Sequence, residues 1–249
     1  MPIEREKHGD VVVLRMAHGP VNALDLELLT DLTATLTELS EAAPPMVFTG
    51  TGRSFSAGVD LRRITSERVE YIGQFLTALS RAFHAVFEYP GPSVAAINGH
   101  AIAGGFVLAA ACDHRVAADG GARIGLSELT VGVPFPTAAI EIVRHAVGTA
   151  AATRFALGAE LVSVGEAQRH GFIHEIVGAE VLEHTAAMRA RERAGLGAEA
   201  YLLAKRQLQR PVWDNIERHA ATEDAVVAQL WSRSDTLARI QKFMESISE

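Results

Sequence analysis

The chain has 249 residues and a formal net charge of −7, with 30 acidic side chains against 23 Lys and Arg. This length suffices for one large domain or two small ones, and the acidic balance excludes a global basic surface for nucleic acid. A single cysteine, Cys112, excludes an internal disulfide. Because no apolar run approaches the ~18 residues of a membrane span and the charged N-terminus lacks a signal-peptide core, we expect a cytoplasmic protein without a membrane partner.

Strands and helices are mixed in the first part of the chain. Two segments, 2–7 and 11–16, flank a turn at 8–10 and predict a hairpin. Asp25 is suited to cap a helix over 26–39, because leucines recur there at helical spacing. The elements expected next are a strand at 46–49, an amphipathic helix at 67–88 and a buried strand at 93–97.

The pattern becomes wholly helical towards the C-terminus. Short strands at 114–118, 123–125 and 175–177 are still mixed with helices. The helices expected in this half are 138–147, 149–157, 164–170, 179–194, 198–210, 214–231 and 234–246. This order predicts an α/β fold, with a body over 1–194 and a C-terminal helical region over 195–249. The apolar side chains of that region suit either an oligomer interface or docking on the protein's own core.

The segment 97–113, INGHAIAGGFVLAAACD, is the most informative stretch of the chain. A turn at Asn98-Gly99 leads to a helix of small residues that opens near Gly104 and Gly105. Each glycine costs a helix ~1 kcal/mol relative to alanine, so a compensating gain is expected. The first-turn N–H groups of a helix lack intrahelical acceptors, and the Gly104 N–H could therefore bind an oxyanion. A glycine seam, where the helix packs tightly on a sheet, explains the pattern equally well.

The segment 53–61, RSFSAGVDL, is the second informative stretch. It follows a predicted strand and carries small residues at Ser56, Ala57 and Gly58. Small side chains let a ligand approach the backbone closely. A tight loop with buried apolar side chains accounts for the same residues, so this stretch alone does not define a site.

Four motifs in register resemble one known family. They are PVNALD at 20–25, RSFSAGVDL at 53–61, INGHAIAGGFVLAAACD at 97–113 and IGLSELTVGVP at 124–134. In this order and spacing they resemble the crotonase superfamily, the enoyl-CoA hydratases and isomerases. The resemblance implies a spiral of ββα repeats and a C-terminal helical region that builds homotrimers, which often pair into hexamers. It also implies an acyl-CoA thioester as substrate, with coenzyme A as part of that substrate and no separate cofactor.

The resemblance also implies roles for individual residues. In the family, two backbone N–H groups form an oxyanion hole, and the matching residues here are Val59 and Gly104. Such donors stabilise the enolate of a thioester, and losing one typically costs about 100- to 1000-fold in rate. The Ala57 carbonyl would accept from the adenine, whereas Asp60 fits a structural role in the loop as well as a ligand contact. The family's CoA-binding loop matches Ala57, Gly58, Asp60 and Leu61.

The acidic residues decide between the reactions of the family. Its hydratases use two glutamates, and the first of these positions holds Val107 here, three residues past Gly104 on one helix face. The second position matches Glu128, which without the family could be a surface or capping carboxylate. One carboxylate suits a proton shuttle from C2 to C4 of a 3-enoyl-CoA, so the pattern favours a Δ3,Δ2-enoyl-CoA isomerase. Burial should raise the pKa of Glu128.

Two other functions stay open from the sequence. A hydratase, or another family reaction, would need a second acid, for which only Glu141 and Asp60 come into consideration. A non-catalytic acyl-CoA-binding protein agrees with Val107 and disagrees with an intact Glu128. Basic residues such as Lys205 could meet CoA phosphates or lie on solvated faces. The ten histidines form no HExxH motif or Cys–His cluster, so a metal site has no support.

Overall fold

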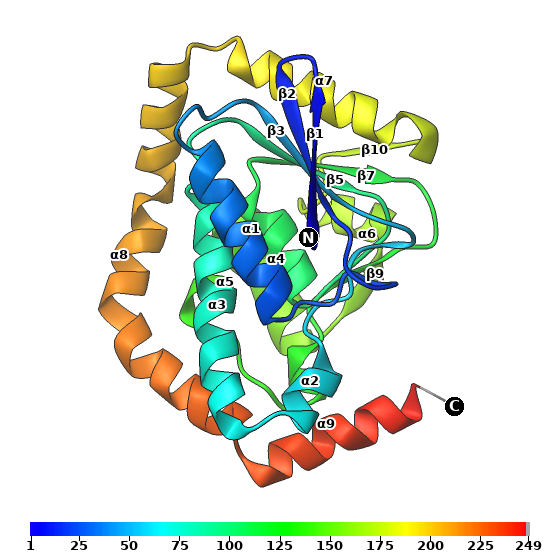
Figure 1. Ribbon diagram of the computed structural model, residues 1–249, viewed down its shortest axis with the longest axis vertical. Helices are drawn as coiled ribbons and strands as arrows, with labels where there is room; N and C mark the ends of the chain where they lie inside the picture. Colours follow the sequence, from blue (N-terminus) through cyan, green and yellow to red (C-terminus); the bar gives the residue numbers. More distant parts are fainter. Residues whose placement is uncertain (248–249) are drawn as a thin grey trace.

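The computed structural model describes residues 1–247 and contains two β-sheets surrounded by helices (Figure 1). The strands are β1 (Ile3–His8), β2 (Val11–Met16), β3 (Met46–Gly50), β4 (Ser54–Ser56), β5 (Ser93–Ile97), β6 (His100–Ile102), β7 (His114–Ala118), β8 (Arg123–Gly125), β9 (Leu161–Ser163) and β10 (Glu175–Val177). The helices are α1 (Leu26–Leu39), α2 (Leu61–Ser66), α3 (Val69–Phe87), α4 (Gly104–Ala111), α5 (Thr137–Gly158), α6 (Val164–Arg169), α7 (Leu182–Ala194), α8 (Ala198–Trp231) and α9 (Ser234–Ser246), with short 3₁₀ turns η1 (Glu128–Thr130) and η2 (Ala179–Val181). The expected α/β class is confirmed.

The larger sheet has six strands in the order β1-β2-β3-β5-β7-β10. All neighbouring pairs are parallel except β1 and β2, which form the predicted antiparallel hairpin. Helices cover both faces, which is why the central strands are continuous apolar runs without alternation. In β2, Val11 and Val13 belong to the cluster around α7, whereas Val12 and Leu14 face the main core with α1 and α3.

The smaller sheet has four strands in the order β4-β6-β8-β9, and its first three strands are parallel. Three successive repeats each place one strand in the larger sheet and the next strand in the smaller sheet before a helix or 3₁₀ turn. These repeats are β3-β4-α2, β5-β6-α4 and β7-β8-η1. The chain therefore forms the ββα spiral that the sequence resemblance implies.

Two helices test the capping and breaking signals of the sequence. The Asp25 carboxylate accepts from the Leu28 N–H at 2.9 Å, and α1 has the predicted bounds. Gly148 interrupts α5 with φ 75° and ψ 163°, which confirms the expected division of that segment into two helices. Among residues 1–247, no helix combines the length and apolar character that a membrane crossing requires.

The C-terminal helices wrap around the body (Figure 1). The sequence predicts two helices separated near Pro211, but this is wrong, because α8 is a single helix of 34 residues that includes Pro211. A proline removes one N–H and bends a helix without necessarily ending it, and buried Gln209 and Val212 hold both halves on the core. At the end of α8, Trp231 donates to the Pro134 carbonyl at 3.0 Å. From there α9 turns back to lie beneath α2.

Candidate active site

Three parallel strands of the smaller sheet end at one edge. β4, β6 and β8 are neighbours and run in the same direction, so their C-terminal ends lie together. Val59, Gly104 and Glu128 each follow one of these ends by two or three residues. Ligands of α/β proteins commonly bind where parallel strands end. The fold therefore brings the three residues with predicted catalytic roles to the same edge.

The backbone N–H of Val59 is unpaired in a loop that is otherwise well bonded. Leu24 and Val59 form an isolated parallel bridge. In this bridge Leu24 donates to the Gly58 carbonyl at 2.8 Å and accepts from the Asp60 N–H at 2.9 Å. Since Leu24 bonds to the two neighbours of Val59, the N–H of Val59 itself points away from Leu24. Within residues 1–247 it has no hydrogen-bond acceptor.

The second unpaired N–H belongs to Gly104, which directly follows a residue with a strained backbone. Ala103 precedes α4 with φ 53° and ψ −125°, a conformation that residues with a Cβ rarely adopt and that is often found at functional sites. Gly104 follows as the first residue of α4, and its N–H has no acceptor in the described part of the chain. A Cβ built on Gly58 would lie 3.5 Å from the Gly104 nitrogen. The two unpaired N–H groups thus occur on segments in contact, an arrangement suited to an oxyanion.

The two glycines at the start of α4 have different surroundings. A Cβ on Gly105 would lie 2.4 Å from the backbone oxygen of Ser56, which cannot move without shifting β4. A Cβ on Gly104 would meet the end of the flexible Leu24 side chain at 2.6 Å. Tight packing on the sheet therefore explains Gly105, and Gly104 keeps the free N–H that anion binding needs.

Glu128 is a partly buried carboxyl group at the start of η1. Its Oε2 accepts from the Ser127 N–H at 2.9 Å, and no other neighbouring residue within 1–247 donates to the carboxyl group. Burial raises the pKa of Glu128 to about 7, against the opposing effect of the backbone N–H donors. The predicted direction is confirmed. A carboxyl group with this pKa can both accept and return a proton near neutral pH.

The structure provides no second acid at the positions considered from the sequence. The position of the first family glutamate holds Val107, an inert side chain that is fully buried within α4. Glu141, on α5, accepts from Asn215 Nδ2 at 2.9 Å and pairs with Arg144 at 2.9 Å. These bonds connect Glu141 to α8 and to its own helix. Glu141 is therefore not available as a second catalytic carboxylate.

The residues of the expected CoA loop take distinct places. Asp60 caps α2 by accepting from the N–H groups of Arg62 and Arg63 at 3.0 and 3.2 Å, the structural role that the sequence left open. Leu61 opens α2 and packs partly against the core. The Ala57 carbonyl accepts no hydrogen bond in the described residues, so it is free for a ligand.

Two residues of this edge were not singled out from the sequence. The positive φ of Ala103 has no signal in the residue type, since alanine rarely adopts it. Asn22 is fully buried beside β4 with φ 51°. Its signal was the tolerance of asparagine for positive φ, within a short motif between a strand and a helix.

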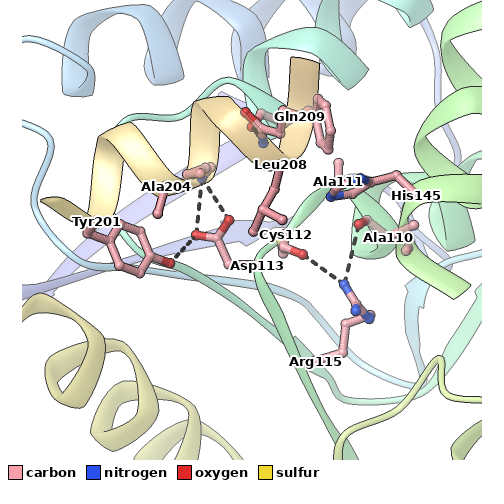
Figure 2. A pocket seen from close by; sticks show the side chains of 13 residues that line it. Ala110, Ala111, Cys112, Asp113, Arg115, His145, Tyr201, Ala204, Leu208 and Gln209 are labelled. Atoms are coloured by element: carbon pink, nitrogen blue, oxygen red, sulfur yellow. Dashed lines mark hydrogen bonds and ion pairs between the residues drawn. The ribbon is translucent and has the colours of Figure 1, made fainter. Parts of the chain in front are cut away.

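A separate cavity of about 280 Å³ lies between the end of α4 and α8, and none of the residues at the strand ends lines it (Figure 2). Figure 2 shows the Tyr201 hydroxyl donating to Asp113. Lys205 is buried here, with Nζ 2.8 Å from Asp113 Oδ1 and 2.7 Å from the Tyr89 carbonyl. Both readings that the sequence left open for Lys205, a phosphate contact and a solvated face, are therefore wrong. These bonds attach α8 to the body.

The ββα spiral, with unpaired N–H groups and one carboxyl group at its strand ends, is the arrangement that the sequence resemblance implies. The family model described as enoyl-CoA hydratase/isomerase matches residues 6–248. The chain belongs to the enoyl-CoA hydratase/isomerase family. This confirms the resemblance of the four sequence motifs.

Individual relatives carry the names of both reactions. A Thermus thermophilus protein named as an enoyl-CoA hydratase is 40% identical over 161 residues, which span 62% of each chain. A Mycobacterium tuberculosis structure described as a probable enoyl-CoA hydratase has a TM-score of 0.84 at 30% identity. The match covers 94% of this chain and 100% of that chain. A second structure of the same protein is described as an enoyl-CoA isomerase. The human mitochondrial Δ3-Δ2-enoyl-CoA isomerase structure has a TM-score of 0.94 at 24% identity, covering 100% and 98% of the two chains, which establishes the fold.

Proposed function

We propose that the protein is a Δ3,Δ2-enoyl-CoA isomerase of fatty acid metabolism with Glu128 as its one acid–base residue. One observation carries the proposal. The Glu128 carboxyl group lies beside the strand ends and accepts from only one other residue, Ser127, within 1–247, whereas the other glutamate position of the family is the buried apolar Val107. A hydratase must both activate water and protonate carbon, while an isomerase needs one group that takes and returns the same proton.

The proposed reaction begins at C2 of a 3-enoyl-CoA. Glu128 removes a C2 proton, and the C–H electron pair forms a C1–C2 double bond as charge moves to the thioester oxygen. The resulting dienolate is then protonated at C4 by the same Glu128 carboxyl. The electrons return from the oxygen, and the double bond now joins C2 and C3. With a pKa of about 7, Glu128 is suited to both steps near neutral pH.

The unpaired N–H groups of Val59 and Gly104 are proposed to bind the thioester oxygen. Two donors aimed at one oxygen stabilise the charge that develops in the enolate more than the neutral carbonyl, and this lowers the barrier. Because the donor is the backbone N–H, the side chain at residue 59 takes no part in the proposed chemistry, and valine is compatible with the role. The CoA part of the substrate is proposed to follow the loop 57–61, where the Ala57 carbonyl is free.

A homotrimer is proposed for the assembly. Support comes from the family resemblance and from three apolar side chains of α8 with high exposure: Leu203, Leu208 and Val226 are 59%, 69% and 51% exposed. Burial of these side chains between subunits would remove apolar surface from water. Sedimentation equilibrium measures the mass in solution. A mass equal to one chain at micromolar concentration contradicts the trimer.

The test of the reaction is a spectrophotometric assay with 3-enoyl-CoA substrates of several chain lengths, following formation of the conjugated 2-enoyl thioester. Glu128→Gln keeps the shape and the Ser127 hydrogen bond but cannot take a proton, so its rate should fall at least ~100-fold. The control is Glu70→Gln, at an exposed position on α3, which should retain the parental rate.

The outcomes separate the competing functions. Isomerisation that disappears in Glu128→Gln supports the proposal, and isomerisation that persists in that variant contradicts the assigned base. Hydration of a 2-enoyl-CoA faster than isomerisation favours a hydratase. Binding of acyl-CoA without turnover of any unsaturated thioester favours a binding protein.

A further inference from the structure

The loop that carries the Val59 N–H is held from both sides. The Ala57 N–H donates to the Val21 carbonyl at 3.0 Å, and the Asp60 N–H donates to the Leu24 carbonyl at 2.9 Å. Both acceptors come from the segment between β2 and α1, which runs alongside the loop. The backbone around Val59 therefore follows the shape of this neighbouring segment.

Between these two bonds, a side chain holds Gly58. Ser56 Oγ accepts from the Gly58 N–H at 3.1 Å and donates to the Asn22 carbonyl at 2.7 Å. Ser56 is fully buried, so bulk water does not compete for these bonds. The Ser56 hydroxyl thus connects the Asn22 carbonyl to the Gly58 N–H through two hydrogen bonds, and we call this connection the relay.

Asn22 is itself fixed to the strand that enters the loop. Its Nδ2 donates to the carbonyls of Ser54 and Phe55 at 3.0 and 3.2 Å, both of which belong to β4. Its Oδ1 accepts from the His18 N–H at 3.0 Å. Asparagine tolerates the left-handed φ of 51° better than most residues with a Cβ. The Asn22 carbonyl thus has a defined position relative to β4.

Gly58 has little room to move away from this relay. Its φ is 87°, and a Cβ built there would lie 2.7 Å from the Ala103 Cβ and 2.9 Å from the Ile102 carbonyl. Gly58 therefore sits directly against the turn that leads into Gly104. Any displacement of Gly58 alters the separation of the Val59 and Gly104 N–H groups.

We infer that Asn22 and Ser56 are positioning residues that fix the direction of the Val59 N–H in the oxyanion hole. The inference rests on the proposed function, because the hole is the feature being positioned. Without the Ser56 hydroxyl, the buried Gly58 N–H has no acceptor, and the loop shifts to find one. A displacement of about 1 Å at a reacting group can cost about 100-fold in rate.

Ser56→Ala tests the relay, and Ser54→Ala is its matched control. Ser54 lies in the same strand and is also buried, but its hydroxyl makes no hydrogen bond within residues 1–247. With 3-enoyl-CoA, Ser56→Ala should lower kcat by about 10- to 100-fold and leave KM within about threefold, since the donor acts mainly on the enolate. Ser54→Ala should match the parental kcat. A Ser56→Ala enzyme with the parental kcat overturns the inference.

Two further variants keep the inference falsifiable if Ser56→Ala does not fold. Ser56→Cys retains a weak donor and acceptor, so its kcat should lie between those of the parent and Ser56→Ala. Asn22→Gly keeps the positive φ and the carbonyl but removes the side-chain bonds to β4, and should lower kcat with little change in KM. Parental kcat values in both variants contradict the positioning role.

The Val59 amide reports on the relay without any turnover. If the parental protein isomerises no enoyl-CoA, the proposed function fails, and the amide signal still tests the inference. Ser56→Ala should shift the Val59 amide resonance and speed the hydrogen exchange of the Gly58 amide, which loses its acceptor, whereas Ser54→Ala should leave both unchanged. An unaltered Val59 amide in Ser56→Ala overturns the relay.

Discussion

The Lys205 ammonium on α8 lies 2.8 Å from Oδ1 of Asp113, which directly precedes β7. Asp113 Oδ2 also accepts from the Tyr201 hydroxyl at 2.8 Å and from the Ser93 N–H at 2.9 Å. The two charged side chains are largely shielded, with exposures of 6% for Lys205 and 16% for Asp113. This network connects α8 to the first residue of β5, Ser93, and to the segment that follows α4.

Lys205→Met should lower the free energy of unfolding by ~3 kcal/mol, because the Asp113 carboxylate would stay buried without its counter-ion. Arg206 supplies the control, since it is exposed and makes no ion pair within residues 1–247. Arg206→Met should change the free energy by less than ~0.5 kcal/mol. Urea unfolding followed by circular dichroism measures both variants. Equal unfolding midpoints would contradict a stabilising role for the pair.

The two glycines of α4 should respond differently to alanine. Gly105→Ala places a Cβ against the Ser56 backbone, so it should cost ~1–3 kcal/mol of stability through overpacking. The new Cβ of Gly104→Ala clashes only with the flexible end of the Leu24 side chain, and the variant gains helix propensity, so its loss should be smaller. Thermal unfolding ranks the variants. A Gly104→Ala protein that is less stable than Gly105→Ala would contradict the packing described here.

The elements with long apolar patterns could be predicted from the sequence. The leucine spacing and Asp25 define α1 correctly, and the run of valines in β2 indicates a strand buried on both faces. The three-residue strands β4, β6 and β9 are too short for a periodic pattern and are not predicted from the sequence. β8 and β10 are equally short but are predicted at 123–125 and 175–177, so length alone does not decide the outcome. Pro211 is a breaker in isolation, and only the tertiary contacts of α8 show that the helix continues.

The site residues could be named from the sequence motifs, but the way they are arranged in space could not be predicted. Val59, Gly104 and Glu128 are far apart in the chain, and only the parallel order of β4, β6 and β8 brings them to one edge. The capping role of Asp60 is local and could be anticipated. The relay through Ser56 to Asn22 joins residues 34 positions apart, so it depends on the fold and has no sequence period.

The pH dependence of the reaction should follow Glu128. The carboxylate must be ionised to remove the C2 proton, and its pKa is about 7. We therefore expect kcat/KM for a 3-enoyl-CoA to be constant above pH 8 and to fall about tenfold per unit well below pH 7. Steady-state rates across pH 5 to 9 measure the profile, with unfolding monitored at each pH. A profile that stays flat down to pH 5 contradicts Glu128 as the base.

Glu128→Gln should be inactive and yet more stable than the parental protein at alkaline pH. Burial raises the pKa of Glu128 in the folded protein from 4.5 to about 7, so folding disfavours the charged form. The stability contributed by the protonated carboxyl is complete below pH 4.5 and is lost as pH rises through about 7. Glutamine does not ionise and keeps an oxygen for the Ser127 N–H, so it avoids this loss.

The size of the effect follows from the difference between the two pKa values. A shift from 4.5 to about 7 corresponds to at most about 3 kcal/mol. Denaturant unfolding should therefore find the two proteins equally stable near pH 4, and Glu128→Gln more stable by up to this amount at pH 8. A variant that is less stable than its parent at pH 8 would mean that the fold stabilises the charged carboxylate. In that case Glu128 would be a structural carboxylate, and its assignment as a base poised near neutral pH would fail.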